Sequence, residues 1–225
     1  MNSELQKRIV TSIFLTLLLI AMFFYTFILI ISLIIIAIIS WIEFYALISN
    51  IFRKNDQKNR VFRFICKALS LIYLSTLVYF VLLAKTANDE TEIVIVYSIL
   101  ISVLSDIGGL VIGKIFKGRK LTKISPKKTI SGSIGSFVFS LSLLPFFIEL
   151  LPNIDLIIFI VVTLLISFTS QMGDLFISYL KRKAKVKDTS DILPGHGGLL
   201  DRIDGIIFAI PIGFILFNLF WYEKK

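Results

Sequence analysis

Long apolar runs separated by short polar stretches dominate the pattern of the chain. The first run, from residue 9 to residue 50, carries no charged side chain except Glu43. One straight helix of that length would be roughly 60 Å long, about twice the hydrocarbon thickness of a bilayer. The run therefore predicts two membrane crossings, with a turn near Phe24 to Phe27.

Further apolar runs occupy residues 62–84, 93–113, 134–151, 154–172 and 205–221. Each is long enough to cross a bilayer once as a helix, and hydrophobic residues make up 56% of the 225 positions. The pattern predicts an all-α polytopic membrane protein of about seven transmembrane helices. We expect one membrane domain over residues 1–225, with N-terminal helices at about 9–84 and a C-terminal half at about 93–221.

The basic residues fall almost entirely on one set of loops. Lys and Arg in short loops stay on the cytoplasmic side of a membrane. With the N-terminus in the cytoplasm, 21 of the 24 basic residues lie in the cytoplasmic segments 7–8, 53–67, 114–128 and 181–202. The charge pattern thus predicts a cytoplasmic N-terminus and an even number of crossings in the first run.

Charge and cysteine content narrow the range of partners. The net charge of +9 comes from loops at the membrane edge, where anionic lipid headgroups and a phosphorylated substrate are nearer than nucleic acid. We therefore expect no nucleic acid partner. Cys66 is the only cysteine, which excludes an intrachain disulfide and a Cys/His zinc site. The basic start MNSELQKRIV lacks a small-residue cleavage pattern, so we expect a retained first helix.

A polar island at residues 178–204 interrupts the apolar pattern. Its 27 residues hold four Asp, the only His, three Gly, one Pro and six Lys or Arg. Solvating a surface does not require that mixture, which has the composition of a site for phosphate chemistry.

The helix that leads into this island aligns a carboxylate with a hydroxyl and two cations. Asp174, Ser178, Lys181 and Arg182 are spaced i, i+4, i+7 and i+8, so a continued helix places them on one face. The alternative is a helix leaving the bilayer with snorkelling cations. That alternative explains Lys181 to Lys187 but not Asp174 at the end of an apolar span.

The segment PGHGGLLDRID runs into the last apolar span. A glycine-rich turn before a helix exposes backbone N–H groups that suit an anion. Asp201 and Asp204 share a helix face and repel each other unless a cation such as Mg²⁺ is bound. Alternatively, the two carboxylates only complement the helix dipole, with Arg202 as their salt partner. His196 either binds phosphate or shuttles a proton near neutral pH, or it is a solvated turn residue.

An upstream segment adds a second set of polar residues. Asp106 falls inside an apolar span, where an ionisable group marks a functional or paired site. Gly108, Gly109 and Gly113 predict close helix packing. The turn Ser125 to Thr129 (SPKKT) then places cations and hydroxyls where an oxyanion could bind, although a basic loop alone also serves as a topology signal.

These residues resemble the signature of phosphatidate cytidylyltransferases, also called CDP-diacylglycerol synthases. The patterns are S-x-x-K-R-x-x-x-x-K-D and P-x-H-G-G-x-x-D-R-x-D, with Q-x-G-D and D-x-G…G…SPKKT upstream. The residues that match are Asp106, Gly113, Ser125 to Thr129, Gln171, Gly173, Asp174, Ser178, Lys181, Arg182, Lys187, Asp188, Pro194, His196, Gly197, Gly198, Asp201, Arg202 and Asp204. The resemblance covers roughly the C-terminal half, which would then be the catalytic half with its signature at 178–204.

The resemblance implies transfer of CMP from CTP to phosphatidic acid, which gives CDP-diacylglycerol and pyrophosphate. It implies Mg²⁺ held by Asp174 and Asp201, with Asp188 and Asp204 as the next candidates. The implied catalytic residues are Asp174, Lys181, Arg182, Lys187, Asp188, His196, Asp201, Arg202 and Asp204. The implied substrate-binding residues are Asp106, Ser125, Lys127, Lys128, Ser178, Gly197 and Gly198. We further expect a bacterial cytoplasmic membrane, a site on its cytoplasmic face, and a homodimer.

One position departs from the family pattern. The family usually has an acidic residue shortly after the SPKKT turn, often in a W-E-G sequence, and this chain has Ile130, Ser131 and Gly132 there. The lost carboxylate at Ser131 bears on catalytic rate or substrate preference.

Two other functions compete with this interpretation. A CTP-dependent lipid-alcohol kinase of the dolichol or phytol type would transfer the terminal phosphate of CTP. An ion-coupled transporter would use Asp106 and Asp174 along an ion path and would release no pyrophosphate.

Overall fold

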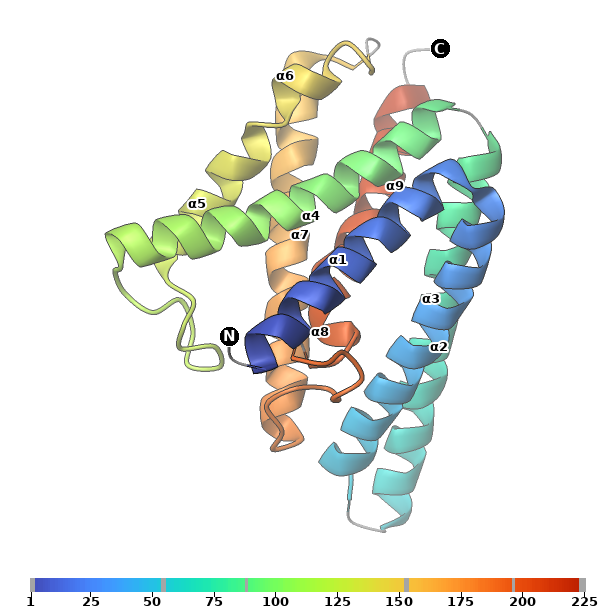
Figure 1. Cartoon of the computed structure of the whole chain (residues 1–225), viewed down its shortest axis with the longest axis vertical. Helices are drawn as coiled ribbons and strands as arrows, with labels where there is room; N and C mark the ends of the chain where they lie inside the picture. Colours follow the sequence, from blue (N-terminus) through green and yellow to red (C-terminus); the bar gives the residue numbers. More distant parts are fainter. Residues whose placement is uncertain (1–2, 54–55, 88, 152–153, 196, 223–225) are drawn as a thin grey trace. The chain divides into compact units, whose positions relative to one another are not determined.

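The computed structural model describes residues 3–53, 56–87, 89–151, 154–195 and 197–222 (Figure 1). Within these ranges the regular structure is helical, which confirms the all-α prediction. The helices are α1 (Ser3–Phe24), α2 (Thr26–Ile51), α3 (Gln57–Ala87), α4 (Asp89–Phe116), α5 (Ile130–Leu141), α6 (Leu144–Phe147), α7 (Leu156–Lys183), α8 (Leu200–Ile203) and α9 (Ile206–Tyr222).

The helices reproduce the apolar runs of the sequence. Six segments of the described chain are long and apolar enough to cross a membrane: 26–51, 57–87, 89–116, 130–147, 156–183 and 200–220. The remaining run is a shorter apolar helix over Ile9–Phe24. The break between α1 and α2 falls at Tyr25, whose backbone is extended (φ −121°, ψ 105°). The first run therefore turns where the sequence predicted.

The chain divides into two compact units. The first unit comprises residues 1–78 and 180–203, and the second comprises residues 79–179 and 204–225. In the first unit, α2 packs on both α1 and the short helix α8. A hydrogen bond from Trp41 Nε1 to the Lys67 carbonyl (3.2 Å) links α2 to α3. The first unit thus brings residues of the polar island against the N-terminal helices.

Close helix packing in the second unit joins α4 to α5. A Cβ atom at Gly108 would lie 2.5 Å from the Gly135 carbonyl oxygen, and one at Gly132 would lie 2.7 Å from the Gly109 carbonyl oxygen. Only glycine permits such an approach of two backbones. The close packing that Gly108, Gly109 and Gly113 predicted is therefore present, with α5 as the partner helix.

Buried hydroxyl groups connect the helices of the second unit. Ser102 Oγ lies 2.7 Å from Ser170 Oγ, which joins α4 to α7. Ser136 Oγ of α5 donates to the Ser105 carbonyl at 2.6 Å, and Ser167 Oγ of α7 donates to Ser105 Oγ at 3.2 Å. Hydrogen bonds of this kind hold transmembrane helices together where burial of apolar surface provides little driving force.

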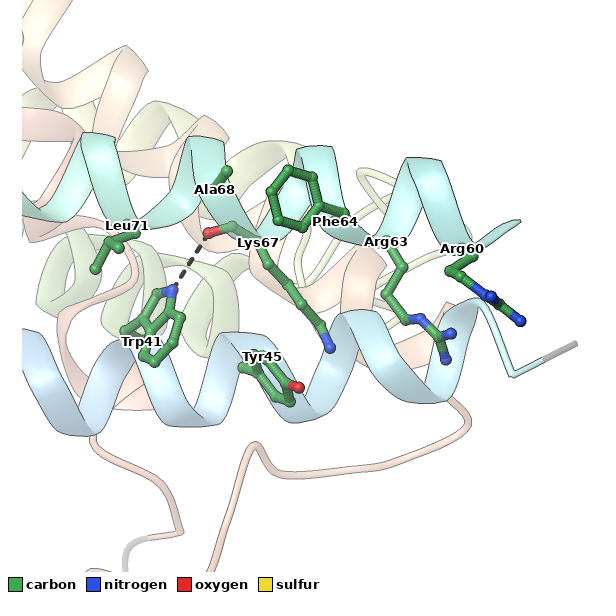
Figure 2. A pocket seen from close by; sticks show the side chains of 8 residues that line it. All are labelled: Trp41, Tyr45, Arg60, Arg63, Phe64, Lys67, Ala68 and Leu71. Atoms are coloured by element: carbon green, nitrogen blue, oxygen red, sulfur yellow. Dashed lines mark hydrogen bonds between the residues drawn. The ribbon is translucent and has the colours of Figure 1, made fainter. Parts of the chain in front are cut away.

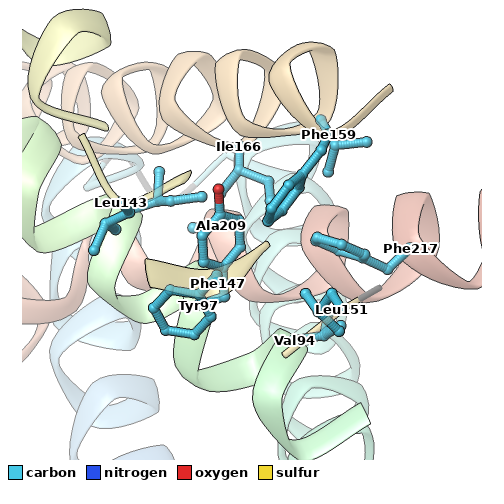
Figure 3. Packing of buried hydrophobic residues seen from close by; sticks show 11 residues of the cluster. Val94, Tyr97, Leu143, Phe147, Leu151, Phe159, Ile166, Ala209 and Phe217 are labelled. Carbon is cyan, nitrogen blue, oxygen red and sulfur yellow. The ribbon is translucent and has the colours of Figure 1, made fainter. Parts of the chain in front are cut away.

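An aromatic core fills the rest of the second unit (Figure 3). Tyr97 is fully buried, and its ring centroid lies 4.7 Å from that of Phe147 and 5.1 Å from that of Phe159. The Tyr97 hydroxyl lies 2.6 Å from Thr163 Oγ1, which supplies the partner that a buried phenol requires. This core fixes α4, α7 and α9 relative to one another within the unit.

Candidate functional site

The polar island begins where α7 ends. Val186 N–H donates to the Lys181 carbonyl at 3.0 Å, and Lys185 N–H donates to the Arg182 carbonyl at 3.2 Å. Lys185 has the left-handed backbone (φ 60°) that typically closes a helix in this way. The chain therefore reverses directly after α7, and the loop that follows stays close to the cations of the last turn.

Asp201, at the start of α8, is the centre of the loop in the first unit. Its Oδ1 accepts a hydrogen bond from Lys181 Nζ at 2.6 Å, and the two side chains form an ion pair. Its Oδ2 accepts from the backbone N–H groups of Thr189 (2.8 Å) and Gly198 (3.2 Å). The side chain of Asp201 is 6% exposed, so this carboxylate organises the loop as well as presenting negative charge.

Asp188 lies beside the same centre. A Cβ atom at Gly197 would lie 3.3 Å from Asp201 Oδ2 and 3.5 Å from the Asp188 carboxyl carbon. Gly197 also has a left-handed backbone (φ 82°), which a residue with a side chain rarely adopts. The glycine therefore lets the chain pass between two carboxylates, and Asp188 and Asp201 flank it.

Glu43 of α2 accepts four hydrogen bonds from this loop and was not among the site residues that the sequence predicted. Its side chain is buried, with the residue 2% exposed. The carboxylate accepts hydrogen bonds from the N–H groups of Leu199 (2.9 Å) and Leu200 (2.7 Å) and from Thr189 Oγ1 (2.9 Å). Ser190 Oγ is a fourth donor. Its signal in the sequence was its position as the one charge of the first apolar run.

A second cluster lies in the second unit around Asp174 of α7. Ser178 Oγ donates to Asp174 Oδ1 at 3.3 Å, as their spacing of four residues predicted. Lys128 Nζ forms an ion pair with Asp174 Oδ2. Asp106 of α4 is within electrostatic reach of both Asp174 and Lys128. The structure therefore brings two predicted residues from other segments, Lys128 and Asp106, toward Asp174, which pairs with Ser178 on its own helix.

The SPKKT segment forms the expected turn. Lys128 N–H donates to the Ser125 carbonyl at 3.0 Å, and Thr129 Oγ1 caps α5 by accepting from Gly132 N–H at 3.0 Å. Ser131, the position of the lost carboxylate, donates from its hydroxyl to the Lys117 carbonyl. In this chain Ser131 thus closes the loop between α4 and α5.

Gln171, one turn before Asp174 on α7, has an amide group that is half satisfied. Ser133 Oγ of α5 donates to Gln171 Oε1 at 2.6 Å. Gln171 Nε2 is buried and has no hydrogen-bond partner among the described residues. A buried donor without a partner is uncommon in folded proteins.

The remaining predicted residues differ in their exposure. Asp204 is buried, and its Oδ1 accepts from Gly205 N–H at 2.9 Å. The Asp204 carbonyl oxygen packs against Gly173, the residue before Asp174. A Cβ atom on Gly173 would lie 2.6 Å from this oxygen. Four of the predicted site cations are exposed to solvent: Lys127, Arg182, Lys187 and Arg202. His196 lies outside the described residues, so its role stays a prediction.

The oxygen donors of the two clusters suit a hard divalent ion. Among the described residues no group of three or more His, Cys, Asp and Glu side chains gathers as a metal cluster. Mg²⁺ commonly uses one or two protein carboxylates and takes its other ligands from water and substrate phosphates. The carboxylates of Asp174 and of the Asp188–Asp201 pair fit that mode in chemical type, and each of Asp174 and Asp201 already contacts a lysine ammonium.

The helices and these lysine–aspartate pairs define the class of protein. This is an integral membrane protein with six candidate spans in the described ranges and two polar clusters, each of which contains a lysine–aspartate pair. The chain belongs to the Cytidylyltransferase family, whose model matches residues 1–220. The match includes the N-terminal half, where sequence reasoning found only generic apolar spans.

Proteins named phosphatidate cytidylyltransferase are similar to this chain. The one from Rickettsia prowazekii is 39% identical over 145 residues, which cover 60% of this chain and 62% of the relative. The one from Bacillus subtilis is 37% identical over 155 residues, with 68% and 57% covered. The one from Staphylococcus haemolyticus is 36% identical over 160 residues, with 69% and 60% covered. The matches therefore span less than two thirds of the relatives' length.

Proposed function

We propose that this chain transfers CMP from CTP to phosphatidic acid, giving CDP-diacylglycerol and pyrophosphate. The observation that carries the proposal is the Asp201 centre, in which Lys181, Thr189 and Gly198 converge on one carboxylate inside the signature loop. The names of the similar proteins support the same reaction.

The reaction needs charge neutralisation more than proton transfer. A phosphate oxygen of phosphatidic acid attacks the α-phosphorus of CTP, and the bond from that phosphorus to the bridging oxygen breaks as pyrophosphate leaves. The attacking oxygen is already anionic, so the barrier is its repulsion by the triphosphate. In this proposal Lys181, Arg182, Lys187 and Arg202 offset that repulsion, and Lys127 and Lys128 act from the SPKKT loop.

Other residues of the proposed site bind and orient. The backbone N–H groups of Gly197 and Gly198 donate to phosphate oxygens, and His196 contacts phosphate or carries a proton. Asp106, Ser125 and Ser178 contact substrate. Glu43 positions the loop through its four hydrogen bonds.

Mg²⁺ is part of the proposal, with Asp174 and Asp201 as its ligands and Asp188 and Asp204 as further candidates. When bound, the ion neutralises phosphate charge on CTP. Lys128 and Lys181, which pair with these carboxylates, would contact the phosphate oxygens.

The proposed setting is the cytoplasmic membrane of a bacterium. The basic loops support a site on the cytoplasmic face, because Lys and Arg mark that side of a membrane. Phosphatidic acid enters from the bilayer and CTP from the cytoplasm. A homodimer is the proposed assembly.

The central test is release of pyrophosphate from CTP by the purified protein in lipid vesicles. We expect release that requires both Mg²⁺ and phosphatidic acid. Asp201→Asn should lower the rate by about a hundredfold or more, since one lost charge at a phosphoryl-transfer centre costs several kcal/mol. Asp191→Asn is the matched control, because Asp191 is an exposed carboxylate of the same loop.

The outcomes separate the competing functions. CTP labelled at the α-phosphate should pass its label to the lipid, whereas a lipid-alcohol kinase would pass on the γ-label. Full turnover by the Asp201→Asn protein would contradict the assignment of Asp201. Lipid-independent release, or no release, would contradict the proposed reaction.

A further inference from the structure

A pocket of about 500 Å³ lies between α2 and α3 in the first unit (Figure 2). Trp41 and Tyr45 of α2 form one wall, and α3 lines the other wall with basic and apolar side chains. None of the lining residues has a role in the proposed reaction. The pocket is therefore a separate feature that needs its own explanation.

Three cations gather on the α3 side of this pocket. Arg60, Arg63 and Lys67 are spaced i, i+3 and i+7, so they share one helix face. Like charges at such spacings repel one another. The described residues that line the pocket are basic, aromatic or aliphatic, with no carboxylate among them. An anion bound here would lessen the repulsion between Arg63 and Lys67.

Aromatic contacts hold the innermost cation in place. Lys67 Nζ lies 3.1 Å from the centroid of the Tyr45 ring, and Trp41 Nε1 donates to the Lys67 carbonyl at 3.2 Å. Figure 2 shows the Lys67 side chain extending from α3 to the Tyr45 ring, with Arg63 next to it. A cation–π contact keeps an ammonium ordered while its other faces remain available to a ligand.

The rest of the lining is apolar and exposed. Phe64 is 73% exposed and Leu71 is 47% exposed, and both lie on a helix long and apolar enough to span a membrane. Apolar side chains at such positions face lipid chains. The pocket thus offers cations at the polar end of α3 and apolar surface toward its middle, which matches the two ends of a charged lipid.

We propose that this pocket binds one anionic glycerophospholipid. Its phosphate contacts Arg60, Arg63 and Lys67, and one acyl chain lies along Phe64 and Leu71. Each basic side chain at a membrane surface raises the affinity for anionic headgroups by about fivefold. The proposal goes beyond the proposed reaction and requires neither CTP nor turnover.

The pocket also lies on the opposite side of α2 from the signature loop. Trp41 and Tyr45 are four residues apart and share a face, whereas Glu43 is two residues from each and therefore roughly 160° to 200° around the helix. Glu43 holds the loop, and the lipid would contact the other face of the same helix. Binding at the pocket is thus measurable without blocking the loop.

The chain contains two tryptophans, Trp41 and Trp221, which makes a direct test possible. In a Trp221→Phe protein the emission comes from Trp41 alone. The protein is reconstituted in phosphatidylcholine vesicles with a fixed fraction of brominated phosphatidylglycerol, or with the same fraction of brominated phosphatidylcholine. Bromine on an acyl chain quenches a tryptophan that it contacts. We expect stronger quenching by the anionic lipid.

Two double variants decide whether the pocket is responsible. In the Trp221→Phe background, Arg60→Gln with Arg63→Gln should lower the relative affinity for phosphatidylglycerol by about fivefold per side chain. Arg53→Gln with Lys58→Gln removes two exposed charges of the same region that do not line the pocket, and should leave the preference unchanged.

Equal quenching by both lipids in the Trp221→Phe protein overturns the proposal, and this comparison needs no pocket variant. An equal loss of preference in both double variants also overturns it, because the charges would then act only as a general basic surface. Pyrophosphate release is not part of the readout, so failure here is distinct from failure of the proposed function.

Discussion

A single buried carboxylate explains how an apolar helix supports a polar loop. Glu43 is the one charge in a run of 42 residues, from 9 to 50, and a lone charge in a membrane span is costly without partners. The structure supplies four donors, two of them backbone N–H groups at the start of α8. The carboxylate therefore replaces the helix cap that the loop sequence lacks.

Neutralising this carboxylate should loosen the loop. In Glu43→Gln an amide N–H₂ faces donors that need an acceptor, and an unmet buried hydrogen bond to a charged group costs about 1.5–3 kcal/mol. We expect faster trypsin cleavage after Lys183, Lys185 or Lys187, together with lower pyrophosphate release. Helix content by circular dichroism should stay unchanged.

The matched control for this residue is Glu149→Gln, because Glu149 is exposed. It should leave both proteolysis and turnover as in the parent protein. A Glu43→Gln protein with parental proteolysis and reduced turnover would contradict the positioning role and would indicate direct contact with substrate.

At the scale of elements, the glycine-lined contact between α4 and α5 sets the position of the SPKKT turn within the second unit. The sequence predicted close packing at Gly108, Gly109 and Gly113 but not which helix would supply the partner. Gly132 and Gly135 of α5 do so. Glycines serve many purposes in membrane helices, so pairing them requires the fold.

Adding one methyl group to this contact should destabilise the protein. Gly108→Ala would bring Cβ to 2.5 Å from the Gly135 carbonyl oxygen and 2.6 Å from Phe139 Cβ, which forces α5 to move. We expect a loss of about 1–3 kcal/mol, although alanine favours helices by about 1 kcal/mol over glycine. Thermal unfolding in detergent measures the effect.

Leu110→Ala provides the comparison for that variant, since Leu110 is 62% exposed on the same helix. Its unfolding temperature should stay close to that of the parent protein. A Gly108→Ala protein at least as stable as the parent would show that α5 can shift without cost.

For the whole molecule, the alternation of helices and basic loops makes the topology testable. Cysteines introduced one at a time into a Cys66→Ser background can be labelled in intact cells with a membrane-impermeant maleimide. Lys123→Cys and Asp191→Cys lie in loops that hold most of the basic residues, and Asp89→Cys lies in an acidic loop. We expect labelling at position 89 and protection at 123 and 191 until the cells are opened.

Labelling at position 123 or 191 in intact cells would place the basic loops outside and would contradict the proposed cytoplasmic site. All three positions are exposed in the structure, so protection cannot be attributed to burial within the protein.

The sequence by itself determined the class of the protein and the chemistry of its polar residues. Apolar runs of membrane length leave few alternatives to helices, because every backbone group in hydrocarbon must be satisfied internally. The signature spacing identified Asp174, Lys181 and Asp201 before any contact was known. Short-range relations, such as the Asp174–Ser178 pair, follow from helix periodicity.

Only the tertiary structure decided which distant groups meet. Thr189 is 146 residues from Glu43, and Lys67 is 22 residues from Tyr45 on a different helix. Such pairs leave no periodic trace in the chain, because they depend on which helix faces turn toward each other. Glu43 as the support of the loop and the basic pocket between α2 and α3 were therefore visible only in the folded protein.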